Sequence, residues 1–212
     1  MLGDAPYGLC LPNDESGGDS SFLLRFDASD GKERVLTKLP LTAQPLGAVD
    51  GQLLFAVASG PDEDTDSSDG TYETLLRVDA SSGETRPLPL AGAPGGTPTL
   101  LDDAVYFVRD DGTVTAVSAA DGTQLWRKVT EVENLSVPVW SKTYDSVLFA
   151  NRFGRLLALD RATGTQRWRT AALDDPGDTG VDPQLLLVQD AIVAVVGSTA
   201  FSVRPDRPAA VD

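Results

Sequence analysis

The feature that most restricts the fold of this chain is an internal repeat. Residues 112–127 align without a gap on residues 154–169, and Gly, Ala, Thr, Gln, Trp and Arg recur at matching positions. The offset is 42 residues throughout, as the glycines Gly122 and Gly164 show. A repeat of this length indicates a propeller, a solenoid or another array, because each copy is one supersecondary unit that must stack on its neighbours.

Weaker copies of the same segment lie on both sides. Residues 24–33 and 76–85 keep an aspartate and a turn glycine at the matching places, and an eroded fifth copy ends at residues 200–204. Within each period, short runs rich in Val, Leu, Tyr and Thr alternate with Asp-Gly turns, which favour tight hairpins. Four strands per period predict an all-β fold, a β-propeller of four-stranded antiparallel blades with about four to five blades present. A β-sandwich is the alternative, but it does not predict identical residues at a fixed offset.

The repeat also predicts the domain organisation. We expect one propeller over residues 1–212, in which the strands are distributed three, four, four, four and three. The expected blades lie near residues 1–40, 41–90, 91–130, 131–172 and 173–205, with an acidic insertion at 60–70 and a tail at 206–212. The small number of blades and the start inside a strand favour the C-terminal part of a longer ring over a small complete one.

The segment 158–168 resembles the tryptophan-docking motif, A-x-D-x-x-T-G-x-x-x-W, of the pyrroloquinoline-quinone-like propeller repeats. In that family the motif joins the inner hairpin of a blade to its outer strand, and the tryptophan packs between blades. The resemblance implies a structural docking role for Ala116, Gly122, Trp126, Ala158, Asp160, Gly164 and Trp168. Trp140 lies outside the motif, and we expect it in the core.

The resemblance extends to the propellers of outer-membrane assembly lipoproteins and to the sensor propellers of actinobacterial kinases. It does not imply a bound quinone, since the quinoproteins of the group are longer and usually carry a vicinal disulfide. This chain has a single cysteine, Cys10, which we expect to be packed in an apolar run. We therefore predict no cofactor.

Composition excludes several functions. A net charge of −15 argues against nucleic acid as a partner, because phosphate binding needs a basic surface. The chain contains no histidine, which removes Ser-His-Asp and Cys-His centres as well as His-ligated zinc, and we predict that it is not an enzyme. It has no run of about 18 apolar residues that would form a transmembrane segment, and no signal peptide is visible at its start.

These observations favour a non-catalytic scaffold that binds a protein or a small ligand at the bacterial cell envelope, as part of a longer protein. One alternative is the extracellular sensor domain of a larger receptor such as a serine/threonine kinase. Another is a degenerate relative of the quinoprotein dehydrogenases. A propeller hosts unrelated functions, so the fold does not choose among them.

One group of side chains could bind a metal. Asp62, Asp64, Asp66 and Glu73 stand at positions 1, 3, 5 and 12 of a twelve-residue stretch, which is a spacing that calcium loops use. Ser67 occupies the place of the usual turn glycine, and strands are expected on both sides instead of helices. We therefore favour a solvated acidic loop over a calcium site.

Overall fold

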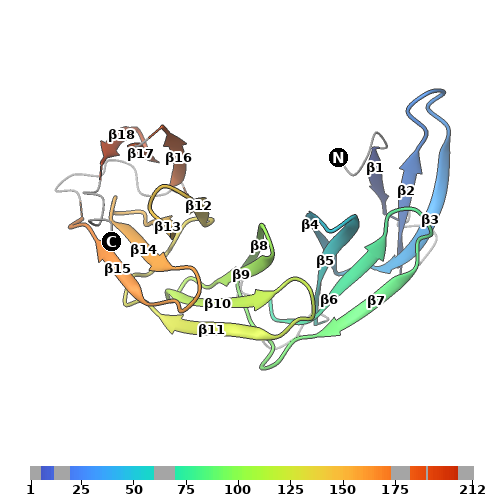
Figure 1. Ribbon diagram of the computed structural model, residues 1–212, viewed down its shortest axis with the longest axis horizontal. Coiled ribbons are helices and arrows are strands. Elements are labelled where there is room, and N and C mark those ends of the chain that lie inside the picture. The colour runs from blue at the N-terminus through green and yellow to red at the C-terminus, as the bar shows by residue number, and fades with distance from the viewer. Residues whose placement is uncertain (1–5, 12–19, 60–69, 173–181, 190, 205–212) are drawn as a thin grey trace, which may run out of the picture. The chain divides into compact units, whose positions relative to one another are not determined.

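A computed structural model describes residues 6–11, 20–59, 70–172, 182–189 and 191–204. The described residues contain strands and no helix, so the predicted all-β class is confirmed (Figure 1). The strands are β1 (Tyr7–Cys10), β2 (Ser20–Phe26), β3 (Glu33–Pro40), β4 (Ala43–Val49), β5 (Gln52–Ala58), β6 (Tyr72–Asp79), β7 (Thr85–Pro89), β8 (Thr97–Leu101), β9 (Ala104–Val108), β10 (Thr113–Ser118), β11 (Gln124–Val129), β12 (Val139–Ser141), β13 (Ser146–Ala150), β14 (Leu156–Asp160), β15 (Gln166–Arg169), β16 (Gln184–Val188), β17 (Ala191–Val196) and β18 (Thr199–Val203).

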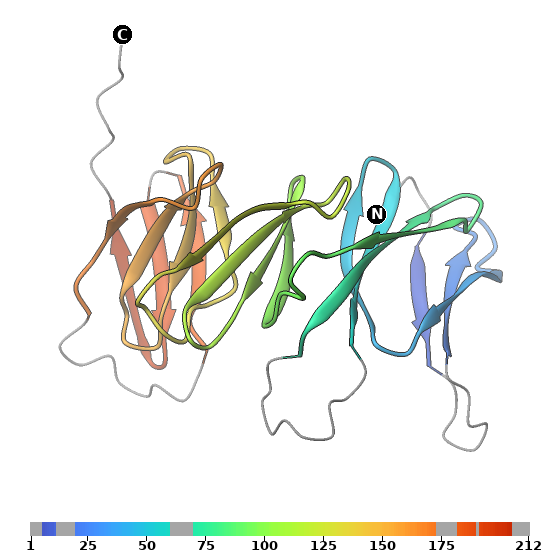
Figure 2. The same ribbon diagram turned by 90° about the horizontal axis from the view of Figure 1, so that it is seen from below.

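The strands form five sheets, in each of which they are hydrogen bonded in chain order. Sheet 1 contains β1 to β3, sheet 2 β4 to β7, sheet 3 β8 to β11, sheet 4 β12 to β15 and sheet 5 β16 to β18. Figure 2 shows the strands of each sheet side by side. This is the three, four, four, four and three distribution of strands that the repeat predicts.

The chain divides into two compact units. The first unit consists of residues 1–104 and 118–123, and the second of residues 105–117 and 124–212, so the division passes through sheet 3. In the first unit an apolar core lies between sheets 1 and 2, around Leu23 and Phe55. In the second unit another core lies between sheets 4 and 5, around Leu148 and Ile192.

Burial follows the position of a strand within its sheet. The second strands of sheets 3 and 4, β9 and β13, are buried at every residue, which requires apolar side chains on both faces. The fourth strands are mostly exposed, and in β11 only Trp126 is buried. Within each unit, neighbouring sheets therefore share their apolar core through strands other than the fourth.

The structure corrects the expectation for Cys10, which is exposed instead of packed. Cys10 ends β1, and among the described residues β1 pairs with β2 alone. The apolar neighbours of Cys10 in sequence suggested burial, but Cys10 is the last residue of β1, and β2 is the only described strand that pairs with it. The sequence pattern cannot distinguish an edge strand from a central one at this point.

Candidate functional site

Four turns with the same geometry form the repeated structural unit of the chain. They join β2 to β3, β6 to β7, β10 to β11 and β14 to β15. In each, a glycine has a positive φ and donates its N–H to the carbonyl four residues earlier; these glycines are Gly31 (φ 69°), Gly83 (78°), Gly122 (77°) and Gly164 (68°). The residue that supplies this carbonyl also donates its own N–H, to the carbonyl of the residue five positions later, with N···O distances of 2.8 to 2.9 Å. A left-handed conformation favours glycine, which accounts for its recurrence.

A side chain at the start of each turn accepts hydrogen bonds from the backbone that follows. Asp160 accepts from the N–H groups of Ala162 and Thr163 at 3.0 and 2.9 Å. Asp27 and Asp79 do the same in sheets 1 and 2, and in sheet 3 the hydroxyl of Ser118 accepts from a backbone N–H at 3.2 Å. The substitution of serine for aspartate in the repeat therefore preserves the turn, because both side chains offer an oxygen acceptor.

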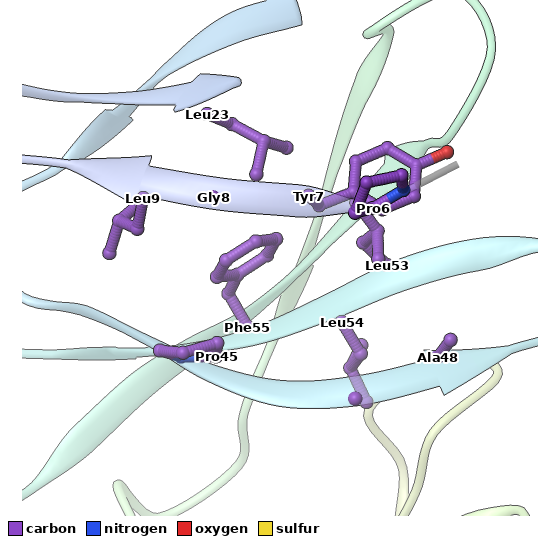
Figure 3. Close-up of a pocket in the computed structure, with 11 residues that line it drawn as sticks. Pro6, Tyr7, Gly8, Leu9, Leu23, Pro45, Ala48, Leu53, Leu54 and Phe55 are labelled. Carbon is purple, nitrogen blue, oxygen red and sulfur yellow. The ribbon is translucent and has the colours of Figure 1, made fainter. Parts of the chain in front are cut away.

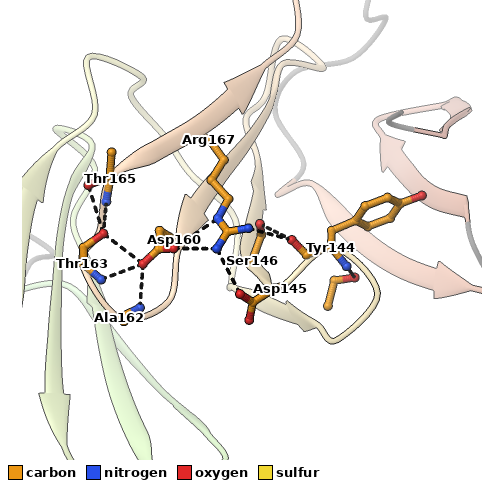
Figure 4. Close-up of polar contacts among 9 residues, drawn as sticks. Tyr144, Asp145, Ser146, Asp160, Ala162, Thr163, Thr165 and Arg167 are labelled. Atoms are coloured by element: carbon orange, nitrogen blue, oxygen red, sulfur yellow. Dashed lines mark hydrogen bonds and ion pairs between the residues drawn. The ribbon is translucent and has the colours of Figure 1, made fainter. Parts of the chain in front are cut away.

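Arg167 joins this turn to the neighbouring hairpin in sheet 4 (Figure 4). Its Nη2 lies 2.6 Å from Asp160 Oδ2 and 3.0 Å from Asp145 Oδ2, and its Nη1 lies 3.5 Å from the Tyr144 carbonyl. The hydrogen bonds from Arg167, followed by those from Thr163, lower the pKa of Asp160. The sequence did not identify Arg167, because it stands at a variable position of the docking motif.

Trp126 joins sheet 3 to sheet 4 within the second unit. Its indole N–H donates to the carbonyl of Arg161, in the β14–β15 turn, at 2.8 Å. The ring lies against Gly164, where an added Cβ would approach the Trp126 Cε3 to 2.5 Å. Tyr106 packs edge-on against the same ring, with 5.8 Å between the centroids. Gly164 is thus required both by its φ and by the closeness of Trp126.

The first unit uses other donors at the corresponding turns. Arg77 on β6 donates from Nη1 to the carbonyl of Ala120, in the β10–β11 turn, at 3.2 Å. In the β6–β7 turn the Ala80 carbonyl accepts from the Tyr7 hydroxyl at 3.0 Å, and the Ser81 carbonyl accepts from Arg34 at 2.8 Å. The sequence did not predict these donors. The only signal was that arginine replaces the motif alanine at Arg77.

The other motif residues lie as follows. Ala116 and Ala158 are fully buried and pair across the sheet with Trp126 and Trp168. Trp168 is half-buried and packs against the core between sheets 4 and 5. Trp140, expected in the core, is also half-buried, and the Arg161 guanidinium lies over its ring at 4.8 Å.

A pocket lies between sheets 1 and 2 in the first unit (Figure 3). Its volume is about 350 Å³, and most of its lining residues are apolar. The lining consists of Pro6, Tyr7, Gly8, Leu9, Leu23, Pro45, Gly47, Ala48, Leu53, Leu54 and Phe55. Pockets of this size and character bind apolar groups.

Three of the four carboxylates considered for calcium, Asp62, Asp64 and Asp66, lie outside the described residues, and so does most of the insertion 60–70. Glu73 is exposed on β6. Within the described part of the chain, no three His, Cys, Asp or Glu side chains form a group that could hold a metal ion. The described residues form no helix, and therefore none that is long and apolar enough to cross a membrane.

Comparison with solved structures places the fold. BamB from Moraxella catarrhalis matches with a TM-score of 0.55 at 18% identity, over 93% of this chain and 60% of that one. The computationally designed protein Ika8 matches with a TM-score of 0.57 at 14% identity, over 93% and 57%. Sqt1 from Saccharomyces cerevisiae matches with a TM-score of 0.58 at 12% identity, over 90% and 52%. The chain thus spans 52–60% of the length of these three proteins.

Sequence comparison gives the family. No curated protein sequence matches the chain. The family model described as outer membrane protein assembly factor BamB matches residues 19–207. Together with the structural likeness, this match confirms the predicted fold class, a propeller-like array of antiparallel blades. The chain therefore belongs to the BamB family of pyrroloquinoline-quinone-like repeat proteins.

Proposed function

We propose that this chain is a non-catalytic scaffold that binds another protein at the cell envelope. The family match over residues 19–207 is the observation that carries the proposal, because the family is described by a role in outer membrane protein assembly. The chain's lack of histidine is consistent with binding, since the commonest general base of enzymes is not available.

The chemistry of the pocket between sheets 1 and 2 supports binding. Tyr7 is the one lining residue with a titratable side chain, and its hydroxyl already donates to the Ala80 carbonyl. The remaining lining residues offer apolar surface, which stabilises a bound apolar side chain by removing it from water.

The acidic groups of the turns have a structural role. Hydrogen bonds from the turn residues lower the pKa of Asp27, chiefly through Ser29, and of Asp79, chiefly through Ser81. The Arg167 side chain does the same for Asp160. A carboxyl with a lowered pKa stays ionised near neutral pH and is a poor proton donor. These aspartates therefore direct their carboxylate oxygens to the turns that follow them.

In-cell photo-crosslinking tests the proposal. A photoreactive amino acid at Ala48, which is exposed and lines the pocket, should crosslink to one envelope protein of outer-membrane assembly, identified by mass spectrometry. The same amino acid at Val35, exposed on β3 and not part of the pocket lining, is the control. Crosslinks to cytosolic proteins only would contradict the proposal. Saturable binding of a small metabolite, without a crosslinked protein, would favour the sensor-domain alternative.

A further inference from the structure

The strands that follow the four docking turns are basic, although the chain is strongly acidic. Together β3, β7, β11 and β15 contain seven Lys or Arg residues and a single acid, Glu33. The whole chain contains 17 Lys and Arg against 32 Asp and Glu. Each of these strands is the last of its sheet and forms one edge of it. Positive charge is therefore concentrated on four edge strands.

On β3 and β15 the protein itself engages these bases. On β3, Arg34 donates to a backbone carbonyl at 2.8 Å, and the Lys38 ammonium lies over an aromatic ring, 5.6 Å from its centroid. On β15, Arg167 lies 2.6 Å and Arg169 lies 3.9 Å from a carboxylate oxygen. These four side chains are thus occupied by internal contacts.

The bases of β11 differ from those of β3 and β15. Arg127 and Lys128 are both exposed, and neither forms an ion pair with a described residue. Leu125 and Val129 on the same strand are 50% and 60% exposed. Strand β11 therefore presents two positive charges and two apolar side chains that no described part of the chain covers.

The backbone of β11 also has a free edge. Among the described residues β11 pairs with β10 alone (Figure 1), and the described chain continues without a gap on both sides of it, over residues 70–172. The N–H of Thr130 donates to the opposite Gly112 carbonyl at 3.1 Å. Because hydrogen-bonded and non-hydrogen-bonded pairs alternate along an antiparallel ladder, the backbone groups of Val129 and Arg127 point away from β10.

Two of the other edges are less suited to pairing. Strand β7 contains Pro87 and Pro89, and proline removes a donor from an edge. Strand β15 has only four residues, whereas β11 has six and no proline. Among these four strands, β11 thus combines uncovered basic side chains with backbone groups that can accept a further strand.

We propose that β11 binds an acidic extended segment of the partner protein, which adds to sheet 3 as an antiparallel strand. The strands of sheet 3 are antiparallel to their neighbours, and antiparallel pairing is slightly the more stable per residue. In strand-addition complexes, backbone hydrogen bonds give affinity and side chains give specificity. The inference rests on the proposed function, a scaffold that binds a protein.

The side chains of β11 indicate the sequence of the bound segment. Acidic residues opposite Arg127 and Lys128 form cross-strand pairs of opposite charge, which stabilise an antiparallel ladder. Apolar residues opposite Leu125 and Val129 remove these two side chains from water. The expected segment therefore has two adjacent acidic residues, with an apolar residue directly before them and another two positions after them.

A second copy of this chain is a poorer occupant. Two β11 strands paired antiparallel about their centres would bring Arg127 and Lys128 opposite the same residues of the other copy, and like charges directly opposite are destabilising. An anionic membrane surface would attract both bases, but it would leave the outward backbone groups of Arg127 and Val129 without a strand partner. An acidic strand satisfies the charges and the backbone together.

Peptide binding tests the charge complementarity. The probe is a fluorescent peptide with the sequence Thr-Val-Glu-Glu-Thr-Val-Thr, and we expect saturable binding by fluorescence anisotropy. Arg127→Glu combined with Lys128→Glu should weaken binding at least about tenfold, and a peptide with lysines in place of the two glutamates should restore it. The control is Lys142→Glu, which reverses an exposed base in the β12–β13 turn and should leave binding unchanged.

Val129→Pro tests the strand edge itself. Because the Val129 N–H points away from β10, proline removes a donor from the free edge and none from the β10–β11 ladder. Binding of the glutamate peptide should weaken at least about tenfold, while the circular dichroism spectrum stays that of the unmodified chain. Val129→Thr keeps the N–H and is the matched control. If Val129→Pro does not fold, the charge reversal decides.

Several outcomes would overturn the proposal. One is the absence of saturable peptide binding, and another is binding that neither the charge reversal nor Val129→Pro weakens. Binding to vesicles of anionic phospholipid without binding of the peptide would make a membrane surface the occupant. A dimer that Val129→Pro converts to monomer would make it a second copy of the chain.

Photo-crosslinking in cells identifies what covers the edge in the full-length protein. A photoreactive amino acid at Val129 should crosslink to an envelope protein at a segment of the expected acidic sequence. Val35 on β3 is the matched control, because it is a valine of similar exposure, 58% against 60%, and should not crosslink to that segment. A crosslink from Val129 to another part of its own chain would overturn the proposal.

The two proposals can fail separately. If crosslinks at Ala48 identify an envelope partner but the glutamate peptide does not bind, the scaffold function stands and the strand addition is wrong. If the peptide binds as expected but the crosslinked proteins are cytosolic, the strand site stands and the envelope function is wrong.

Discussion

In the two compact units, different side chains form the hydrogen bonds between neighbouring sheets. In the second unit the Trp126 indole donates to the Arg161 carbonyl, and in the first unit the Arg77 guanidinium donates to the Ala120 carbonyl. Both acceptors are backbone carbonyls in turns of the same geometry. What the repeat preserves is the acceptor turn with its glycine, whereas the donor varies. Loss of the motif tryptophan from a repeat therefore does not mean loss of the contact between sheets.

The tryptophan contact and the arginine contact differ in the chemical group that is buried. Trp126 is 7% exposed and contributes a large apolar ring along with its hydrogen bond. Arg77 is 8% exposed, its Nε has no hydrogen-bond partner, and Asp50 lies 3.9 Å from its Nη2 with an exposed side chain. Burial of a guanidinium with incomplete partners offsets part of what its hydrogen bond contributes. We expect the tryptophan contact to be the stronger of the two.

The largest effect is expected for Trp126→Ala. Deletion of a buried large aromatic side chain costs about 3–5 kcal/mol, because apolar contacts are lost and a cavity remains. Trp168→Ala is the comparison, and it should cost less, since Trp168 is only half-buried. Urea unfolding followed by tryptophan fluorescence measures both, because all three tryptophans lie in the second unit. An equal loss in the two variants would contradict the difference in docking.

Glycine substitutions separate backbone strain from close packing. Gly31 and Gly164 have nearly the same φ, but an added Cβ meets nothing within 4 Å at Gly31 and meets Trp126 at Gly164. Gly31→Ala should therefore cost about 1–2 kcal/mol, from the left-handed backbone alone. Gly164→Ala should cost about 2–4 kcal/mol, since overpacking adds to it. The free energy of unfolding from urea titrations tests this. Equal costs for the two substitutions would show that the Trp126 ring moves aside without loss of stability.

A smaller effect is expected for Arg77→Met, which keeps the length of the side chain and removes its donors. Loss of the hydrogen bond to Ala120 should cost about 1–2 kcal/mol, partly offset because no charge is buried. Urea unfolding followed by circular dichroism should report the loss. Lys128→Met, at an exposed position of β11, is the control and should be nearly neutral. A loss of unfolding free energy for Arg77→Met as large as that for Trp126→Ala would contradict the expectation that the tryptophan contact is the stronger one.

The sequence predicted the sheets and turns because the repeat carries them directly. The recurring glycine and aspartate determine a turn through local backbone conformation and local hydrogen bonds, so their spacing was sufficient. Trp126 was assigned a docking role from the motif, and it contacts the next turn.

The remaining donors could not be predicted for a physical reason. Tyr7, Arg34 and Arg77 stand at different positions of their repeats and reach a turn 43 to 73 residues away, so no common spacing identifies them. Cys10 was misplaced because an apolar run has the same pattern on an edge strand as on a central one.

The smallest expected effect concerns the Asp160–Arg167 pair. Arg167 and Thr163 lower the pKa of Asp160 in the folded protein. A lowered pKa contributes stability that is fully present above the unfolded value, about 4, and is lost as the pH falls through the folded value. Asp160 and Arg167 are 23% and 31% exposed in their side chains, so solvent screening limits the contribution to less than about 1 kcal/mol.

Asp160→Asn keeps an oxygen acceptor for the turn and removes the charge that faces Arg167. It should destabilise the second unit at pH 7. The difference from the unmodified chain should begin to narrow as the pH falls below about 4, where the unfolded carboxyl takes up a proton, and should vanish once the native carboxyl is protonated as well. Urea unfolding monitored by tryptophan fluorescence at pH 7, 5 and 3.5 measures this. Glu133→Gln, which removes an exposed carboxylate elsewhere in the second unit, should show no comparable pH-dependent difference. A constant deficit for Asp160→Asn at every pH would mean that the turn depends on the shape of the side chain and not on its charge.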